Sequence, residues 1–233
     1  MKVQLQLFGA SSILAKEYYK KNKNKYLITR YSSSINTGKN IDDFFYEKRK
    51  NTNVIFFSHI KKKPKATIPL IQKVIDHCKK NNCQLIYISS VNAEFPKQSR
   101  YSNIKNICEK IVADNCFNYV RLGIVKSIPA FGPYKALISL KTKHFEFNFE
   151  NNSIIYLTNI DSFTKCDLSN IKKNITIIDN TCNLNSFMKN PNAIVKLKLG
   201  FIIIFIRKLS QIVTLPNILD RALTLTAFKE NHG

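Results

Sequence analysis

The sequence predicts an α/β fold in which a doubly wound parallel sheet has helices on both faces. Short apolar runs typical of buried strands alternate with amphipathic stretches through the first half of the chain. The first apolar run ends at Gly9, and a turn of small residues leads from it into a helical pattern. Alternating strands and helices favour parallel pairing, because each return to the sheet then uses a helical crossover.

The expected elements follow one another closely. Runs rich in β-branched and aromatic residues predict strands at 3–8, 25–31, 53–59, 83–90 and 117–125. Apolar residues at helical spacing predict helices at 13–22, 41–48, 67–82 and 102–114. Ligands of such sheets bind beyond the carboxyl ends of the strands, so we expect the functional residues there.

The pattern loosens after residue 126. Segments 153–163 and 174–179 each resemble a strand, and 194–228 is apolar and helical in pattern, interrupted at Pro216. These segments either extend the sheet or form a second lobe. We predict a core over 1–126 and a reduced C-terminal lobe over 127–233, which completes the sheet and the substrate site and ends in an apolar helical tail over 195–228.

The chain is strongly basic. Its 233 residues include 37 Lys and Arg against 15 Asp and Glu, a formal charge of +22. Such a charge indicates either an anionic partner or a compositional bias toward Lys and Asn. No nucleic-acid-binding motif is present, so we expect no nucleic-acid partner.

Cysteine and histidine usage indicates neither a metal site nor export. The six cysteines contain no C-x-x-C pair, and the four histidines form no ligand pattern. The first apolar run is short and strand-like, so we expect no signal peptide. Thiols in a chain without export signals are typical of the reducing cytoplasm, which we expect to be the location.

The most apolar stretch, 195–216, leaves two interpretations open. Its uninterrupted apolar run at 201–206 is far shorter than the about 20 residues that span a bilayer. With its flanking lysines it could lie as an interfacial helix on the inner face of an anionic membrane. Alternatively, it packs on the domain or on a second copy of the chain, as in a homodimer.

Tyr101 and Lys105 form the first candidate catalytic pair. Four residues apart on an expected helix, they lie on one face. An ammonium group beside a phenol favours the phenolate and lowers its pKa, which makes the phenol a useful proton donor or acceptor near neutral pH. This spacing also arises by chance in a lysine-rich chain. Ser90 strengthens the functional interpretation, because a hydroxyl at the end of the preceding strand could hydrogen-bond a substrate oxygen.

Four stretches together resemble the extended and atypical short-chain dehydrogenases/reductases, the NAD(P)-dependent sugar epimerase/dehydratase group. They are "LFGASSILA" (7–15), "LIYISSVNAEF" (85–95), "YSNIKNICEKIV" (101–112) and "YVRLGIV" (119–125). As in that family, Glu109 follows Lys105 by four residues, and the next strand carries Arg121 and Gly123 near its end. "YLTNIDSF" (156–163) is similar to a later family segment in which an Asp follows a short strand.

The resemblance implies a Rossmann-type NAD(P)-binding core over 1–126, a small C-terminal substrate lobe and a role for each catalytic residue. Tyr101 would exchange a proton with a sugar hydroxyl or carbonyl. Lys105 would lower the pKa of that phenol and hold the nicotinamide ribose, and Ser90 would hydrogen-bond the reacting oxygen. The resemblance also implies a set of cofactor-binding residues: Gly9, Ser11, Ser12, Ile13, Arg30, Ser32, Ser33, Ser58 and Lys105.

The glycine loop departs from the family fingerprint in a specific way. In the fingerprint, the first glycine makes a tight turn, the second allows close approach to the pyrophosphate and the third lets the helix pack against the strand. Here Gly9 keeps the turn, Ser12 stands at the approach position and Ala15 at the packing position. After the second strand, Arg30 with the serines at 32–34 favours the 2′-phosphate of NADP(H). NAD(H) with a solvated basic loop is the alternative.

The resemblance implies an NADP(H)-dependent oxidoreductase that acts on a sugar. The first expectation is a keto-sugar reductase and the second a 4-epimerase, acting on a nucleotide- or lipid-linked sugar in surface polysaccharide biosynthesis. The alternative is a catalytically inactive dinucleotide-binding sensor or assembly subunit. A sensor would have no need of the Ser90, Tyr101 and Lys105 set.

Overall fold

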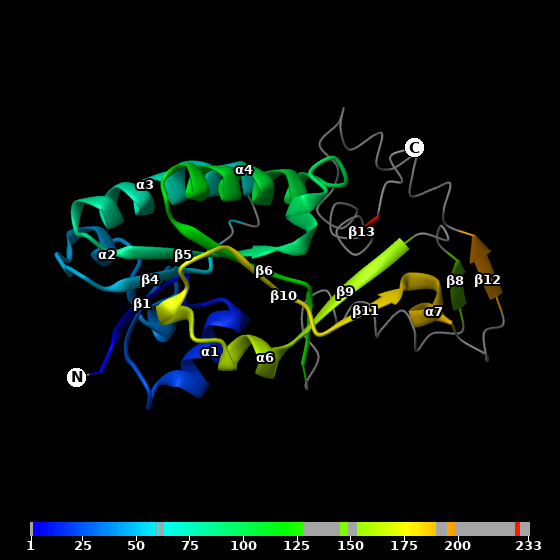
Figure 1. Cartoon of the computed structure of the whole chain (residues 1–233), viewed down its shortest axis with the longest axis horizontal. Helices are drawn as coiled ribbons and strands as arrows, with labels where there is room; N and C mark the ends of the chain where they lie inside the picture. Colours follow the sequence, from blue (N-terminus) through cyan, green and yellow to red (C-terminus); the bar gives the residue numbers. More distant parts are fainter. Residues whose placement is uncertain are drawn as a thin grey trace. The chain divides into compact units, whose positions relative to one another are not determined.

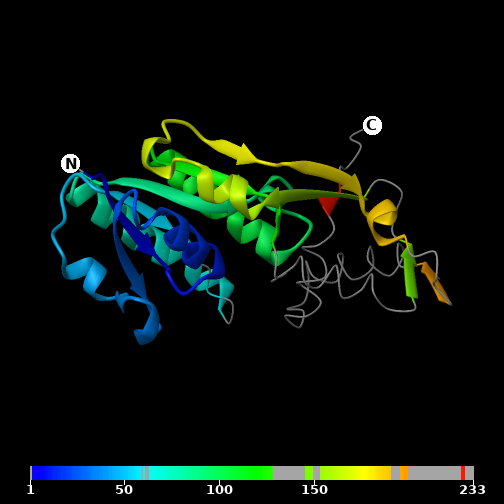
Figure 2. The ribbon, with the colours of Figure 1, turned by 90° about the horizontal axis from the view of Figure 1, so that it is seen from below.

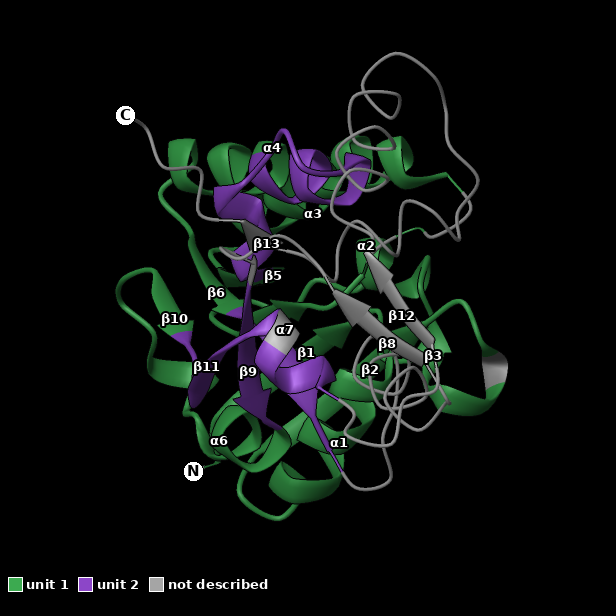
Figure 3. Cartoon of the chain, turned by 90° about the vertical axis from the view of Figure 1, so that its right-hand side faces the viewer, with its two compact units in different colours: residues 1–89, 107–121, 160–176 green, residues 90–106, 122–159, 177–233 purple. Residues whose placement is uncertain are grey.

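The protein divides into two compact units. In the computed structural model (Figure 1), the residues described are 2–58, 60, 63–127, 145–148, 153–189, 195–198 and 227–228. Unit 1 comprises residues 1–89, 107–121 and 160–176, and unit 2 comprises residues 90–106, 122–159 and 177–233 (Figure 3). Each unit is described by itself below.

A seven-stranded sheet forms the centre of unit 1. Its order is β10-β6-β5-β4-β1-β2-β3, so the order of the chain reverses between β1 and β4. The pairs from β3 through to β5 are all parallel. The strands are β1 (Gln4–Phe8), β2 (Leu27–Ser32), β3 (Lys39–Asn40), β4 (Asn53–Phe56), β5 (Gln84–Ser90), β6 (Asn118–Leu122) and β10 (Ile175–Ile177). The predicted Rossmann-type doubly wound sheet is confirmed.

Helices cover both faces of this sheet. Figure 1 shows α3 (Thr67–Lys80) and α4 (Arg100–Asp114) on one face, and Figure 2 is seen from the side of α1 (Ile13–Asn22) and α6 (Ile160–Lys165). The predicted helix at 41–48 is a single turn, α2 (Asp43–Tyr46). Short 3-10 turns complete the connections: η1 (Ile35–Thr37), η2 (Pro64–Ala66), η3 (Val91–Glu94) and η4 (Leu168–Asn170).

Aromatic rings fill the core on both sides of the sheet. Phe8 stacks on Phe56 with ring centroids 5.2 Å apart and meets Phe44 edge-on at 5.0 Å. On the other face, the Tyr18 ring of α1 lies 5.7 Å from the Phe163 ring of α6. Because neighbouring residues in register point to the same face, the alternating apolar runs predicted from sequence place these rings in two layers.

Unit 2 contains a second small sheet built on β9 (Ser153–Asn159). It pairs in parallel with β7 (Ile124–Lys126) and antiparallel with β11 (Asn180–Asn183) and β13 (Ala227–Phe228). Helix α7 (Leu184–Met188) follows β11, and a separate parallel pair joins β8 (Phe145–Asn148) to β12 (Val195–Lys198).

The expected strand at 117–125 is wrong as a single element. It divides at Gly123 into β6 and β7, which belong to different sheets. A Cβ at Gly123 would lie 2.5 Å from the backbone oxygen of Tyr156, and the Gly123 N–H donates to Thr158 Oγ1 at 2.8 Å. The chain changes sheets where only glycine allows β7 and β9 to approach this closely.

Two further expectations need correction. The expected strand at 153–163 ends at Asn159, and Ile160–Lys165 is helical. The expected helical tail is wrong where it is described, because Val195–Lys198 and Ala227–Phe228 are strands. Val195–Lys198 reads V-K-L-K, an alternation with the period of a strand. The remainder of the tail lies outside the described residues, and the division at residue 126 stays a prediction.

No helix among the described residues has the length and hydrophobicity needed to cross a membrane. The membrane and dimer interpretations of 195–216 stay predictions.

Candidate functional site

Gly9 makes a tight turn at the end of β1. Its φ is +82°, a conformation that side chains with a Cβ rarely adopt. The N–H groups of Gly9 and Ala10 both donate to the Tyr31 carbonyl, at 3.0 and 2.9 Å. A Cβ at position 9 would lie 2.8 Å from the Ser58 nitrogen. Backbone conformation and space therefore both require glycine here.

The loop leads directly into the N-terminus of α1. Ser12 is the N-cap, with its Oγ accepting from the Ala15 N–H at 3.2 Å, and Ala15 is buried against the domain. Ser12, which the sequence places at the approach position of the family loop, thus uses its side-chain oxygen to cap the helix. A hydroxyl that accepts one hydrogen bond can still donate its own hydrogen. Ser11 and Ile13 are exposed.

The loop therefore fits an anionic group. The first turn of α1 contains no acidic residue, and helix N-termini present unpaired N–H groups and a partial positive charge. Gly9 and Ser58 follow β1 and β4, the two strands between which the order of the sheet reverses. In doubly wound sheets this reversal is where ligands bind. These residues fit a dinucleotide pyrophosphate.

The candidate catalytic residues all lie in unit 2. Ser90 ends β5 and accepts from the Asn92 N–H at 3.3 Å. Tyr101 and Lys105 lie in the first turns of α4, and the Lys105 Nζ is 5.8 Å from the centre of the Tyr101 ring. Lys105 is only 4% exposed, while Ser90 and Tyr101 are partly exposed. The helical spacing thus places a buried lysine beside a partly exposed tyrosine.

Solved structures with this architecture decide the fold. One is the UDP-N-acetylglucosamine 4-epimerase from Bacillus cereus, with a TM-score of 0.63 and 13% identity over 84% of this chain and 86% of that one. A human epimerase family protein, solved with NADPH, has a TM-score of 0.69 and 9% identity over 96% and 89%. A dTDP-4-dehydrorhamnose reductase ortholog from Clostridium acetobutylicum has a TM-score of 0.60 and 16% identity over 80% and 78%.

The chain has the extended short-chain dehydrogenase/reductase fold. The resemblance seen in the sequence is thereby confirmed at the level of fold. No protein-family model matches the sequence, and no curated protein sequence matches it.

Within this short-chain dehydrogenase/reductase fold, the three candidate cofactor-binding residues near the end of β2 differ from one another in their contacts and exposure. Arg30 lies inside the strand, with its guanidinium 4.1 Å from the centre of the Tyr19 ring of α1. Ser32 is buried, and its Oγ accepts from the Ser34 N–H and the Thr37 hydroxyl at 3.0 and 2.8 Å. Ser33 is exposed. Ser32 thus shapes the turn, and the preference for NADP(H) stays a prediction.

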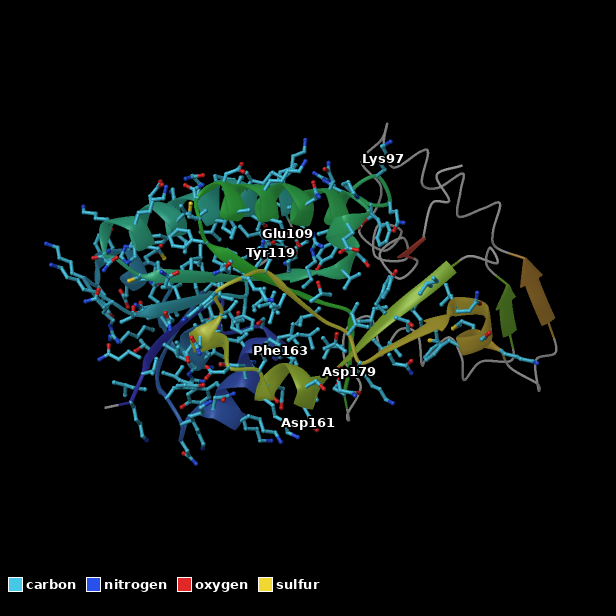
Figure 4. All side chains as sticks on the ribbon, in the orientation of Figure 1. Lys97, Glu109, Tyr119, Asp161, Phe163 and Asp179 are labelled. Carbon is cyan, nitrogen blue, oxygen red and sulfur yellow. The ribbon has the colours of Figure 1, made fainter. Side chains whose placement is uncertain are left out.

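Glu109 and Arg121, two residues of the family pattern, bind each other in unit 1. The Arg121 Nη2 lies 2.7 Å from the Glu109 Oε2, and Glu109 is 3% exposed. The guanidinium also lies 5.1 Å from the centre of the Tyr119 ring (Figure 4 labels Glu109 and Tyr119). This pair joins α4 to β6. Helix α4 is also the helix that carries Tyr101 and Lys105.

Asp161, from the later family segment, is a surface residue of α6. Figure 4 shows it on the outer side of the helix, whereas Phe163 points toward the sheet. Asp161 pairs with Lys21 at 3.4 Å, and the Asn22 amide donates to the Thr164 carbonyl at 2.9 Å. The segment therefore docks α6 on α1.

Sequence reasoning missed the residues that hold the start of α4. The Ser102 N–H donates to the Ser99 Oγ at 3.0 Å, and the two buried hydroxyls are 2.8 Å apart. The Asn106 amide donates to the Ala93 carbonyl at 2.9 Å, which ties α4 to the turn that begins at Ser90. A serine just before a helix is a recognisable capping signal. No sequence signal marks the role of Asn106, because its partner is a backbone atom thirteen residues away in the chain.

Proposed function

We propose that the chain is a cytoplasmic NADP(H)-dependent oxidoreductase acting on a nucleotide- or lipid-linked sugar. The observation that carries the proposal is the buried Lys105 ammonium beside the partly exposed Tyr101 ring, on the helix that follows Ser90. Burying a charged lysine side chain costs free energy unless the charge is paired or hydrogen-bonded. A charge held beside a phenol lowers the pKa of that phenol, which is the requirement for proton transfer near neutral pH.

Each residue of the set has a part in the proposed reaction. The Tyr101 hydroxyl transfers a proton to or from the reacting sugar oxygen, and Ser90 hydrogen-bonds the same oxygen. The Lys105 ammonium favours the phenolate and binds the nicotinamide ribose. A bound dinucleotide supplies the hydride chemistry.

We assign cofactor binding to the loop and strand ends of unit 1. The pyrophosphate would be held by the backbone from Gly9 through Ser11 and Ser12 to Ile13, with Ser58 beside it. Arg30 and Ser33 would meet the 2′-phosphate of NADP(H), on the turn shaped by Ser32. The absence of an acidic residue at 30–34 supports NADP(H) over NAD(H).

The sugar substrate is proposed from the fold. Proteins with similar structures include a UDP-N-acetylglucosamine 4-epimerase and a dTDP-4-dehydrorhamnose reductase ortholog. Reduction of a 4-keto sugar for surface polysaccharide synthesis is our first assignment, and 4-epimerisation the second. Reduction consumes one NADPH for each sugar, whereas epimerisation retains its cofactor, so NADPH absorbance with a panel of nucleotide-linked 4-keto sugars separates them.

The direct test uses Tyr101→Phe, with Tyr46→Phe as the matched control because Tyr46 is 83% exposed on α2. The chain has no Trp, so emission of reduced nicotinamide can be followed without an indole background. We expect wild type and both variants to bind NADPH, more tightly than NADH, and only Tyr101→Phe to lose turnover by about 100-fold or more. Turnover that survives in Tyr101→Phe contradicts the mechanism, and absence of NADPH and NADH binding contradicts the whole proposal.

A further inference from the structure

The amino-terminal end of the unit 1 sheet is lined with exposed lysines. They come from the four segments that precede β2, β4, β5 and β10, and we call them the lysine edge. Its members are Lys20, Lys21, Lys23, Lys25, Lys48, Lys50, Lys79, Lys80, Lys172 and Lys173. These segments, 20–26, 48–52, 79–83 and 170–174, contain no Asp or Glu. Figure 4 shows many nitrogen-tipped side chains on the outside of the unit.

Side-chain hydrogen bonds, most of them from asparagines, connect three of these segments, or residues next to them, at the start of the strands. The three segments are 48–52, 79–83 and 170–174. The bonds are Asn53 Nδ2 to Ser169 O at 2.8 Å, Asn118 Nδ2 to Ile171 O at 3.1 Å, Asn82 Nδ2 to Asn51 Oδ1 at 2.8 Å and Lys79 Nζ to Asn115 Oδ1 at 2.6 Å.

The lysine edge carries a large excess of positive charge. Lys21 lies 3.4 Å from Asp161, and Lys25 lies 3.6 Å from Asp167. Among the residues that the structure describes, the other eight lysines of the edge form no salt bridge. So many like charges repel one another, and an anionic partner would relieve that repulsion.

This charge is too far from the phosphate loop to serve it. The loop starts at Gly9, beyond the carboxyl end of β1, whereas the lysines surround the start of the strands. Five residues of strand span about 17 Å, and exposed charges are largely screened beyond roughly 8 Å at physiological ionic strength. The lysine edge is therefore separate from the loop proposed for the cofactor.

Two exposed apolar side chains accompany the lysines. Val3 is 46% exposed and Leu27 is 56% exposed, and the Leu27 N–H donates to the Val3 carbonyl at 3.0 Å. Basic residues around exposed apolar ones are typical of surfaces that bind the membrane interface. A nucleic-acid surface would be expected to offer arginine forks. Here the one arginine on these segments, Arg49, is held by Glu47 at 2.7 Å.

We propose that the lysine edge binds the anionic surface of a lipid membrane, with Val3 and Leu27 contacting the interfacial region. This surface differs from the apolar stretch at 195–216, and its binding does not depend on the proposed enzymatic function.

The test is sedimentation of the full chain with phosphatidylcholine vesicles, with and without phosphatidylglycerol. The edge variant replaces Lys23, Lys50, Lys80 and Lys172 with Gln, one in each segment. The control variant replaces Lys63, Lys65, Lys73 and Lys110 with Gln, which removes the same charge from exposed positions elsewhere in unit 1. Each lysine near an anionic surface contributes about fivefold to binding, so we expect the edge variant to bind roughly 100-fold or more weakly than wild type.

We expect the control variant to bind nearly as well as wild type, and wild-type binding to require phosphatidylglycerol and to fall as salt is raised. Val3→Ser with Leu27→Ser should reduce the binding that survives at high salt. Equal loss in the edge and control variants overturns the proposal, as does equal binding to both vesicle types. If a structured RNA competes the chain off phosphatidylglycerol vesicles at equal phosphate concentration, the partner is a nucleic acid and the proposal is wrong.

Discussion

The two ends of the unit 1 sheet are built by opposite means. At the carboxyl end, Gly9 and Ser58 are small enough for two backbone segments to meet, and the loop leads into the N-terminus of α1. At the amino end, asparagine side chains connect the segments, and lysines project from them. A parallel sheet gathers loops at both ends in the same way. Side-chain size and charge, rather than topology, therefore give each end its properties.

The ends also differ in their response to pH. The loop from Gly9 to Ile13 contains no titratable side chain. Beside the amino end, His77 lies in the last turn of α3, with its ring 4.5 Å from the Phe44 ring and its Nε2 3.3 Å from the Asn81 amide. Burial lowers the pKa of His77, and the nearby Lys80 lowers it further.

Gly9→Val should disrupt the turn at the carboxyl end of β1 and have the largest effect on stability. A branched side chain at φ +82° is strained, and its Cβ would lie 2.8 Å from the Ser58 nitrogen. Strain and overpacking together should lower the free energy of unfolding by about 3 kcal/mol or more. Urea unfolding followed by circular dichroism measures this, with Ser11→Val at the exposed next-but-one position as the control. Equal unfolding midpoints for the two variants would contradict the assigned turn.

His77 should make the amino end sensitive to acid. Because its folded pKa lies below the ordinary value of 6.5, the unfolded chain binds more protons once the pH falls through 6.5. The stability due to the neutral ring is present above that pH and is lost as the pH falls toward the folded pKa. We expect the unfolding free energy of wild type to fall more steeply between pH 7 and pH 5 than that of His77→Gln. Parallel curves for the two proteins would be inconsistent with a buried neutral His77.

Ser12→Gly should have the smallest effect on the free energy of unfolding. Losing an N-cap to Gly costs only a few tenths of a kcal/mol, whereas Ser12→Ala should cost about 1 kcal/mol, because alanine neither caps nor favours the N-cap conformation. Thermal unfolding of both variants measures the difference. Unchanged stability in Ser12→Ala would show that the bond to the Ala15 N–H does not stabilise α1.

Much of the fold follows from local pattern. The predicted helix at 13–22 matches α1, and the predicted strands at 3–8 and 83–90 match β1 and β5 within one residue. Tyr101 and Lys105 share a helix face as their spacing predicts, because that relation is fixed within one turn. The predictions that were wrong concern residues whose partners are distant in the sequence. The change of sheet at Gly123, for example, depends on Tyr156, thirty-three residues later in the chain.

Residue spacing along the chain is enough to predict the alternation of strands and helices and the Tyr101–Lys105 pair, because each depends on residues within a few positions of one another. The packing of Arg30 on Tyr19 and the ion pair of Glu109 with Arg121 are seen only in the folded chain. The same is true of the lysines, which are scattered over about 150 residues of the chain and gather at one end of the sheet. Such groupings depend on how parallel strands bring distant segments to a common edge, which residue spacing does not record.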